Sequence, residues 1–203
     1  MSTSSSLPLF PLHTVLFPDG LLPLRIFEAR YLDMISRSMR TSTPFGIVPI
    51  RSGREVGPAA DFFPYGTLAS VASFDRGSDG LLNISVLGGE RFAVTQHAVA
   101  NDGLATADVN LLGRAEDDEI GPAFAHLGAL LEDILTKHAP ALADVPRQPG
   151  SALGVSYRLA ELLPLELAQK LAILQAPRGA LALARLDAAV ATLIRRSGQG
   201  DAH

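Results

Sequence analysis

The sequence predicts an α+β protein, in which a curled or barrel-like antiparallel sheet with one inserted helix is followed by four helices. Residues 1–115 contain short β-type runs that are separated by turns rich in Gly, Pro and Asp. Within that half, one stretch repeats apolar residues at steps of three and four, and the later half does so throughout. We therefore expect a sheet subdomain over residues 1–115 and a helical subdomain over residues 116–203, packed as one unit.

The strands are bounded by local turn signals. The first two flank Phe17-Pro18-Asp19-Gly20, which contains the turn-forming Asp-Gly pair. Residues 73–83 read as a hairpin whose loop is Arg76–Gly80. The expected strands are Leu9–Phe17, Leu21–Ile26, Phe45–Ile50, Thr67–Phe74, Leu81–Leu87, Arg91–Thr95 and Leu104–Leu112.

The inserted helix is expected from Phe27 to Arg40. Apolar side chains recur there at helical spacing, while most charged side chains fall between them. This pattern predicts one buried face. The apolar positions are Phe27, Tyr31, Met34, Ile35 and Met39.

Four helices are expected in the second half, and prolines separate them. The acidic run Asp117–Glu119 suits the N-terminus of the first, where negative charge meets the positive end of the helix dipole. A proline-bearing segment, Pro140–Gly150, follows the first helix, and Ser151 is a good N-cap for the second. The expected ranges are Ile120–His138, Ser151–Leu163, Leu165–Ala176 and Arg178–Ser197, the last ending at Gly198.

The composition argues against several kinds of chemistry. Cysteine is absent, which excludes a disulfide framework, a zinc ribbon, an iron–sulfur cluster and a thiol nucleophile. A phosphate-binding P-loop needs a lysine directly after glycine. The two lysines, Lys137 and Lys170, follow Thr136 and Gln169. We therefore expect no ATP hydrolysis.

Other catalytic and metal-binding motifs are also missing from the sequence. There is no G-x-S-x-G elbow, and no two histidines have the spacing of a zinc-binding helix. We therefore expect no catalytic residue, cofactor or metal. A Ser–His–Asp triad assembles in space and is not visible as a motif, so a cryptic hydrolase stays open as an alternative.

One apolar segment is a candidate for binding. Phe62-Phe63-Pro64-Tyr65 lies between two expected strands, and neighbouring residues of an extended chain point to opposite faces. If one phenylalanine is in the core, the other is exposed and marks a binding patch. The alternative is that a bend buries both rings.

Several motifs together resemble the N-terminal, substrate-binding domain of Lon proteases, and the resemblance covers nearly the whole chain. Its most specific part is the opening run, in which Pro18-Asp19-Gly20 replaces the Pro-Gly-Gly that the family often has. The matching stretches are LPLFPLHTVLFPDG at 7–20, LPLRIFEARY at 22–31, FGIV at 45–48, EVG at 55–57, GTLA at 66–69, GGERF at 88–92, LLPL at 162–165 and Lys170-Leu171 with Leu174.

The resemblance implies a PUA-like β-barrel followed by a helical bundle, in a stand-alone, bacterial-type member. It also implies a role in recognising protein substrates, without the ATPase and Ser–Lys peptidase modules of full Lon proteases. Glu28 and Arg30 belong to the opening motif. They cannot pair well two residues apart on a helix, so we expect Glu28 to hold the helix through backbone N–H groups or Arg91. Direct contact of Glu28 and Arg30 with a partner is the alternative.

The leading hypothesis is a non-catalytic module that binds unfolded or apolar protein segments and delivers them to a protease or chaperone. Phe62, Phe63 and Tyr65 are its candidate contacts. RNA binding is the second hypothesis, since PUA-like barrels can bind RNA and four arginines could converge on one face. These are Arg25, Arg30, Arg37 and Arg40. A net charge of -4 counts against nucleic acid as a partner.

No targeting or membrane-spanning segment is visible in the sequence, so we expect a cytoplasmic protein.

Overall fold

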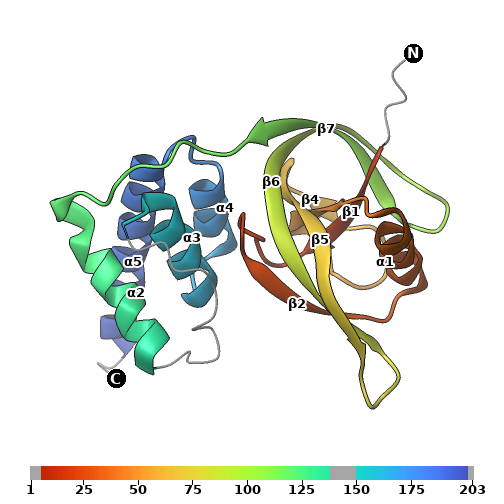
Figure 1. Cartoon of the computed structure of the whole chain (residues 1–203), viewed down its shortest axis with the longest axis horizontal. Helices are drawn as coiled ribbons and strands as arrows, with labels where there is room; N and C mark the ends of the chain where they lie inside the picture. Colours follow the sequence, from red (N-terminus) through yellow and green to blue (C-terminus); the bar gives the residue numbers. More distant parts are fainter. Residues whose placement is uncertain (1–5, 138–149, 201–203) are drawn as a thin grey trace. The chain divides into compact units, whose positions relative to one another are not determined.

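The structure, a computed structural model, describes residues 6–137 and 150–200 (Figure 1). The chain divides into two compact units, Met1–Arg114 and Ala115–His203. In its described part, the first unit holds a seven-stranded sheet and one α-helix, and the second unit holds four α-helices. The fold is therefore a mixed α/β arrangement with strands first and helices second, as the sequence predicts.

The strand pairings of the first unit close into a ring. The order β1-β7-β6-β5-β3 returns to β1 through a parallel β1–β3 pair, and the other pairs are antiparallel. β2 pairs with β6 outside the ring, and β4 pairs with β3. The strands are β1 (Leu7–Leu12), β2 (Leu21–Ile26), β3 (Phe45–Ser52), β4 (Asp61–Phe62), β5 (Tyr65–Arg76), β6 (Leu82–Val99) and β7 (Ala105–Gly113).

Two of the expected strands are one. The glycines at 88–89 suggest a break between Leu81–Leu87 and Arg91–Thr95, but β6 runs through them. Gly88 lies against the turn after Phe17: its N–H donates to Gly20 O at 2.9 Å, and its carbonyl accepts from Asp19 N at 2.9 Å. A Cβ on Gly88 would lie 2.0 Å from Phe17 O. The glycine therefore permits a close backbone approach rather than a turn.

The first expected strand is shorter than predicted. β1 ends at Leu12, and the chain to Phe17 continues without regular pairing, although Val15, Leu16 and Phe17 are buried. Hydrophobic patterning reports burial and does not distinguish a strand from a buried loop. The strand β4 has only two residues, which is too short for a sequence pattern to predict it.

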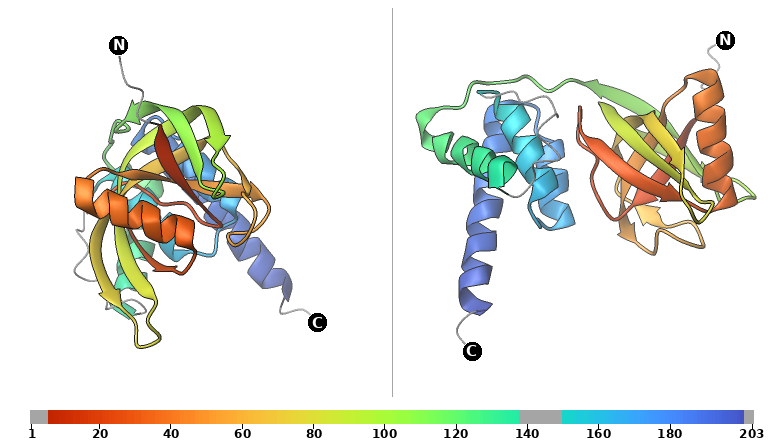
Figure 2. Two further views of the ribbon diagram at one scale, coloured as in Figure 1. Left: turned by 90° about the vertical axis from the view of Figure 1, so that its right-hand side faces the viewer. Right: turned by 60° about the horizontal axis from the view of Figure 1, so that its bottom comes forward.

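α1 (Ala29–Thr41) packs one face into the core of the first unit and lies on one side of the strands (Figure 2). Tyr31, Met34 and Ile35 are buried, as expected, and complete burial of such a side chain stabilises the fold by about 1.5–3 kcal/mol. Phe27 and Met39 are 51% and 36% exposed, contrary to the prediction. Phe27 is exposed because the helix begins only at Ala29, so Phe27 is not on its buried face.

The second unit contains α2 (Ala125–Lys137), α3 (Ala152–Leu162), α4 (Leu167–Leu174) and α5 (Gly179–Gly200), with a 3-10 turn, η1 (Pro122–Phe124), before α2. α5 contacts α3 and α4, and α3 also contacts α2 and α4. The last turns of α5 extend beyond the other helices (Figure 2), where Ile194 is 66% exposed. The fully buried side chains of these helices include Leu127, Leu159, Ile173 and Leu183.

The acidic run Asp117–Glu119 was expected to cap the helix that follows it, but its carboxylates cap α3 and α5 instead. Asp117 accepts from Ser151 Oγ at 2.6 Å and from Leu153 N at 2.9 Å, at the start of α3. Asp118 accepts from Ala180 N at 2.8 Å, at the start of α5. The expectation that Asp117–Glu119 begins the next helix is wrong, because η1 intervenes and the carboxylates serve two N-termini distant in sequence.

The helix boundaries in the second unit otherwise follow the sequence signals. Ser151 caps α3 by accepting from Gly154 N at 2.8 Å, as predicted. α5 continues past Gly198 to Gly200, so that glycine does not end it. Pro140 and most of the segment Pro140–Gly150 lie outside the described residues. No helix in the described part of the chain has both the length and the apolar character needed to cross a membrane.

Candidate functional site

The phenylalanine segment is held down by the sheet. Phe62 is 7% exposed, and its ring meets His97 edge-on with the centroids 5.0 Å apart. Phe63 and Tyr65 are half-buried. Phe63 N donates to Pro49 O at 2.9 Å, which fixes the backbone between β4 and β5. Phe62 is therefore a core residue, and a binding role for Phe63 and Tyr65 stays a prediction.

Glu28 and Arg30 form an ion pair, although we expected residues two apart on a helix to pair poorly. Arg30 Nη2 lies 2.8 Å from Glu28 Oε2, because Glu28 has extended backbone before the first helical residue (φ -81°, ψ 134°). Arg30 also donates to Gly57 O at 2.7 Å and to Gly103 O at 2.9 Å. Its side chain is 7% exposed. The pair therefore ties two loops to α1, and the expected contact between Glu28 and Arg91 stays a prediction.

An aromatic stack continues this cluster into the core. The Arg30 guanidinium lies 4.7 Å from the Tyr31 ring centroid, and the Phe10 and Tyr31 rings stack at 4.0 Å. Burial raises the pKa of the Tyr31 hydroxyl, and Arg30 opposes that rise. These contacts are typical of a structural cluster and leave little of Arg30 for a partner.

A further surface, which no sequence pattern predicted, is formed by β2, β6 and β5. Residues paired across strands share one face of a sheet. The register places Leu21 opposite Leu87 in one row. The next two rows are Pro23, Ser85 and Ser73, and then Arg25, Asn83 and Asp75. We call the surface carrying these three rows the hairpin face.

A hollow of about 460 Å³ lies on this surface. Ile84, among its lining residues, is 3% exposed, and Leu24 packs against the core. The side chains of Ile84 and Leu24 therefore point into the core, and only their backbone atoms line the hollow. The hollow thus opens on the opposite side of the strands, which is the hairpin face. The middle row of the face, Pro23, Ser85 and Ser73, contributes small side chains to its lining. It is lined by Pro23, Leu24, Arg25, Ser73, Phe74, Asp75, Asn83, Ile84 and Ser85.

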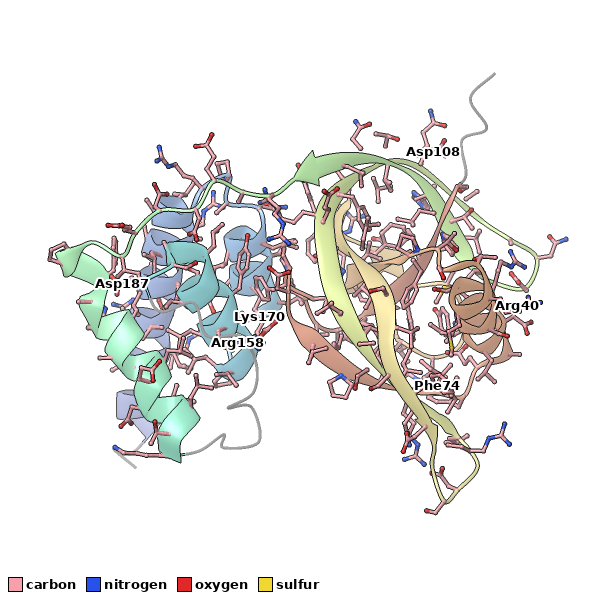
Figure 3. All side chains as sticks on the ribbon, viewed as in Figure 1. Arg40, Phe74, Asp108, Arg158, Lys170 and Asp187 are labelled. Atoms are coloured by element: carbon pink, nitrogen blue, oxygen red, sulfur yellow. The ribbon has the colours of Figure 1, made fainter. Side chains whose placement is uncertain are left out.

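Apolar side chains border the hollow. Leu21 and Leu87 are 46% and 40% exposed and lie directly opposite each other. Phe74 also lines the hollow, but it is paired in register with Ile84, so its side chain, which is 62% exposed, points to the opposite face of the strands. It lies on the extension of the hairpin beyond Ala69, where β3 no longer pairs with β5. Figure 3 labels Phe74 on this extension. Exposed apolar groups next to a hollow are typical of a binding surface.

The hairpin face carries an unbalanced negative charge. Arg25 forms an ion pair with Asp79 in the hairpin loop. Asp79 also accepts from Leu81 N at 3.0 Å, which shapes that loop. Within residues 6–137 and 150–200, the structure gives the Asp75 side chain no ion pair or hydrogen bond.

Sequence signals for this face existed but were incomplete. The hairpin over 73–83 was predicted, and β2 alternates exposed Leu21, Pro23 and Arg25 with inward residues. The pairing of β2 with β6 joins residues more than 50 positions apart, and no local pattern predicts it. The face exists only through that pairing.

The four arginines considered for RNA do not form one exposed patch. Arg30 is buried, and Arg25, on β2, forms an ion pair with Asp79 of the hairpin loop. Arg37 and Arg40 are exposed on α1. In the described part of the chain, no group of three or more His, Asp and Glu side chains is placed to hold a metal ion.

A charged cluster on the second unit includes residues of α3 and α4. Arg158 Nη1 lies 2.6 Å from Glu161 Oε2, and both side chains are less than one-fifth exposed. Burial raises the pKa of Glu161 to about 7, against the opposing effects of Arg158 and Lys170. Burial lowers the pKa of Lys170. Figure 3 labels Arg158 and Lys170 on these helices.

Known proteins resemble this chain over most of its length. Residues 6–186 match the model of the ATP-dependent protease La (LON) substrate-binding domain. The crystal structure of a Lon N-terminal domain protein from Xanthomonas campestris has a TM-score of 0.75 and 36% identity, covering 91% of this chain and 98% of that one. The N-terminal domain of Lon protease from the Mycobacterium avium complex shares the fold, with a TM-score of 0.64 and 19% identity over 90% of this chain and 96% of that one.

Two curated relatives match a shorter stretch. Lon protease 2 of Myxococcus xanthus is 32% identical over 92 residues, and Lon protease of Anaeromyxobacter dehalogenans is 33% identical over 92 residues. Each match covers 44% of this chain and 11% of the relative. The chain thus matches only a small part of each of these relatives.

Proposed function

Because the chain belongs to the ATP-dependent protease La (LON) substrate-binding domain family, we propose that it is a non-catalytic module that binds extended apolar segments of other proteins through the hairpin face. The observation that carries this proposal is the hollow of about 460 Å³ beside the exposed Leu21–Leu87 pair. The ring of strands would be the PUA-like barrel of the family, and α2–α5 would form its helical bundle.

Burial of the exposed apolar row would supply the affinity. Leu21 and Leu87 have 46% and 40% of their surface in water, and covering apolar surface gains about 25 cal/mol per Å². The small side chains of the middle row let an extended segment approach closely. An unfolded segment exposes the apolar groups that such a surface would cover.

The segment would lie on the face of the strands rather than extend the sheet at β2. Among the described residues, β2 pairs only with β6, so its other edge is open. Pro23, in the middle of β2, has no N–H, and in a regular antiparallel strand proline takes the outward-pointing position. An added strand would therefore lack a donor at the centre of this edge.

The finer features of the role are also proposals. The bound segments would come from unfolded proteins, and the module would pass them to a separate protease or chaperone in the cytoplasm. RNA binding is not favoured by a specific observation, because the four arginines are dispersed between the core, β2 and α1. Hydrolysis is not favoured by a specific observation either.

Replacing one apolar residue of the hairpin face tests the proposal. Leu87→Ser removes apolar contact area without touching the core, so we expect about tenfold weaker binding of a permanently unfolded, carboxymethylated client, measured by fluorescence anisotropy. Leu111→Ser is the matched control, because Leu111 is 57% exposed on β7. Equal losses in both variants, or no loss in Leu87→Ser, would contradict a site on the hairpin face.

A further inference from the structure

We propose that the hairpin face selects extended segments in which an apolar side chain and a lysine or arginine stand four residues apart on the same side. Asp75 would receive the basic side chain, and the Leu21–Leu87 row would receive the apolar one. This inference rests on the proposed function and adds to it the chemical class of the segment.

The charges of the face carry the preference. Arg25 is neutralised by Asp79, so Asp75 leaves one net negative charge in the row Arg25, Asn83 and Asp75. The neighbouring Arg76 is paired in register with Leu82, in a row that faces the opposite way. An incoming cation would thus meet an uncompensated carboxylate, whereas an incoming carboxylate would be repelled.

The spacing follows from the register. Leu87 and Asn83 are four residues apart on β6, which corresponds to about 13 Å at 3.3 Å per residue. Asp75 is directly opposite Asn83 on the next strand, about 4.8 Å to the side. The apolar and acidic ends of the face are therefore about 14 Å apart, the length of four residues of extended chain. The small row at Pro23, Ser85 and Ser73 accommodates the side chain between them.

The chemistry favours a peptide that is basic at one end of this span. The hollow is open to water, so the ion pair would add a modest, salt-sensitive increment to the apolar contact. We expect selection among segments, with apolar burial supplying most of the affinity. Because Asp75 is exposed and has no partner among the described residues, its replacement leaves the fold intact.

Three fluorescent nonapeptides of Ser and Ala test the preference. One has Leu and Lys four residues apart, the second has Glu in place of Lys, and the third has Leu and Lys adjacent. At low salt we expect the first peptide to bind about threefold to fivefold more tightly than either other. Asp75→Asn should abolish the preference over the Glu peptide, and Asp75→Lys should reverse it.

Asp108→Asn is the matched control. Asp108 is exposed on β7 and lies far from Phe74 in the same unit (Figure 3). This variant should keep the wild-type preference. Equal binding of the three peptides by the wild-type chain, or a preference unchanged in Asp75→Lys, would overturn the inference and leave the proposed function standing. Binding of no peptide at millimolar concentration would overturn both.

Discussion

At the scale of single residues, Arg30 determines how the loops around α1 are held. Its guanidinium joins Glu28, Gly57 and Gly103 and covers the Tyr31 ring. Lysine could not reproduce this arrangement, because an ammonium cannot donate in several fixed directions and stack at once. The cluster is mostly buried, so removing the arginine would leave the Glu28 carboxylate without its counter-ion.

We expect Arg30→Met to lower the free energy of unfolding by about 3 kcal/mol, as breaking a buried ion pair does. Arg30→Lys should recover only part of this loss. Urea unfolding followed by circular dichroism measures both. If Arg30→Lys keeps full stability but loses client binding, Arg30 contacts the partner and our structural interpretation is wrong.

Asp19 shows how a departure from the family motif is accommodated. It has φ 59°, in a turn closed by Gly20 N and Phe17 O at 3.1 Å. Glycine takes this conformation most easily, and aspartate is among the residues that tolerate it. The sequence interpretation that Pro18-Asp19-Gly20 keeps the turn is therefore confirmed.

At the scale of elements, residues 116–120 join the N-termini of α3 and α5. Glu116 N donates to Pro177 O at 3.1 Å, and its carbonyl accepts from Gly179 N at 2.8 Å. Asp118 also forms an ion pair with Arg178, whose Nη2 lies 2.7 Å from the Asp118 Oδ1. This short segment thus holds together two helices that are separated by α4 in the sequence.

Asp118→Ala should lower the Tm, because α5 loses an N-terminal acceptor and Arg178 loses its partner. The hydrogen bond with Arg178 lowers the pKa of Asp118 below its ordinary value. In the wild type, the stabilisation is therefore complete above the unfolded-state pKa and is lost as the pH falls through the folded-state value.

The Tm difference between wild type and Asp118→Ala should accordingly be largest near neutral pH and shrink toward pH 3. Calorimetry across that range measures it. Asp133→Ala is the control, because the Asp133 carboxylate pairs only with Lys137 on its own helix, among the described residues. A difference that grows toward acid pH would contradict the capping role.

At the scale of the whole molecule, local patterns predict the elements but not their pairing. The order of strands and helices, the hairpin and α1 follow from periodicity and turn residues. The sequence predicts two strands where the structure has β6, because glycines usually mark a turn. Gly88 instead permits a close contact with the turn after Phe17, which is remote in sequence. Phe62 was proposed for binding because neighbouring residues of an extended chain point to opposite faces, and no local pattern shows its ring contact with His97, 35 positions away.

The hairpin face could not be predicted for the same reason. Its rows combine three strands, and the apolar pair Leu21–Leu87 exists only after β2 has paired with β6. The family resemblance supplied the fold and the general role, whereas the position of the surface comes from strand register. Phe63 and Tyr65, which are half-buried, remain the rival location.

Site-specific photo-crosslinking tests the location of client binding most directly. A photoreactive amino acid is placed at Ser85 on the hairpin face, at Phe63 in the rival segment, or at Leu111 on β7, and an unfolded client is added before irradiation. Our account predicts crosslinks from position 85 and none above background from position 111. Crosslinks from position 63 with none from position 85 would contradict it.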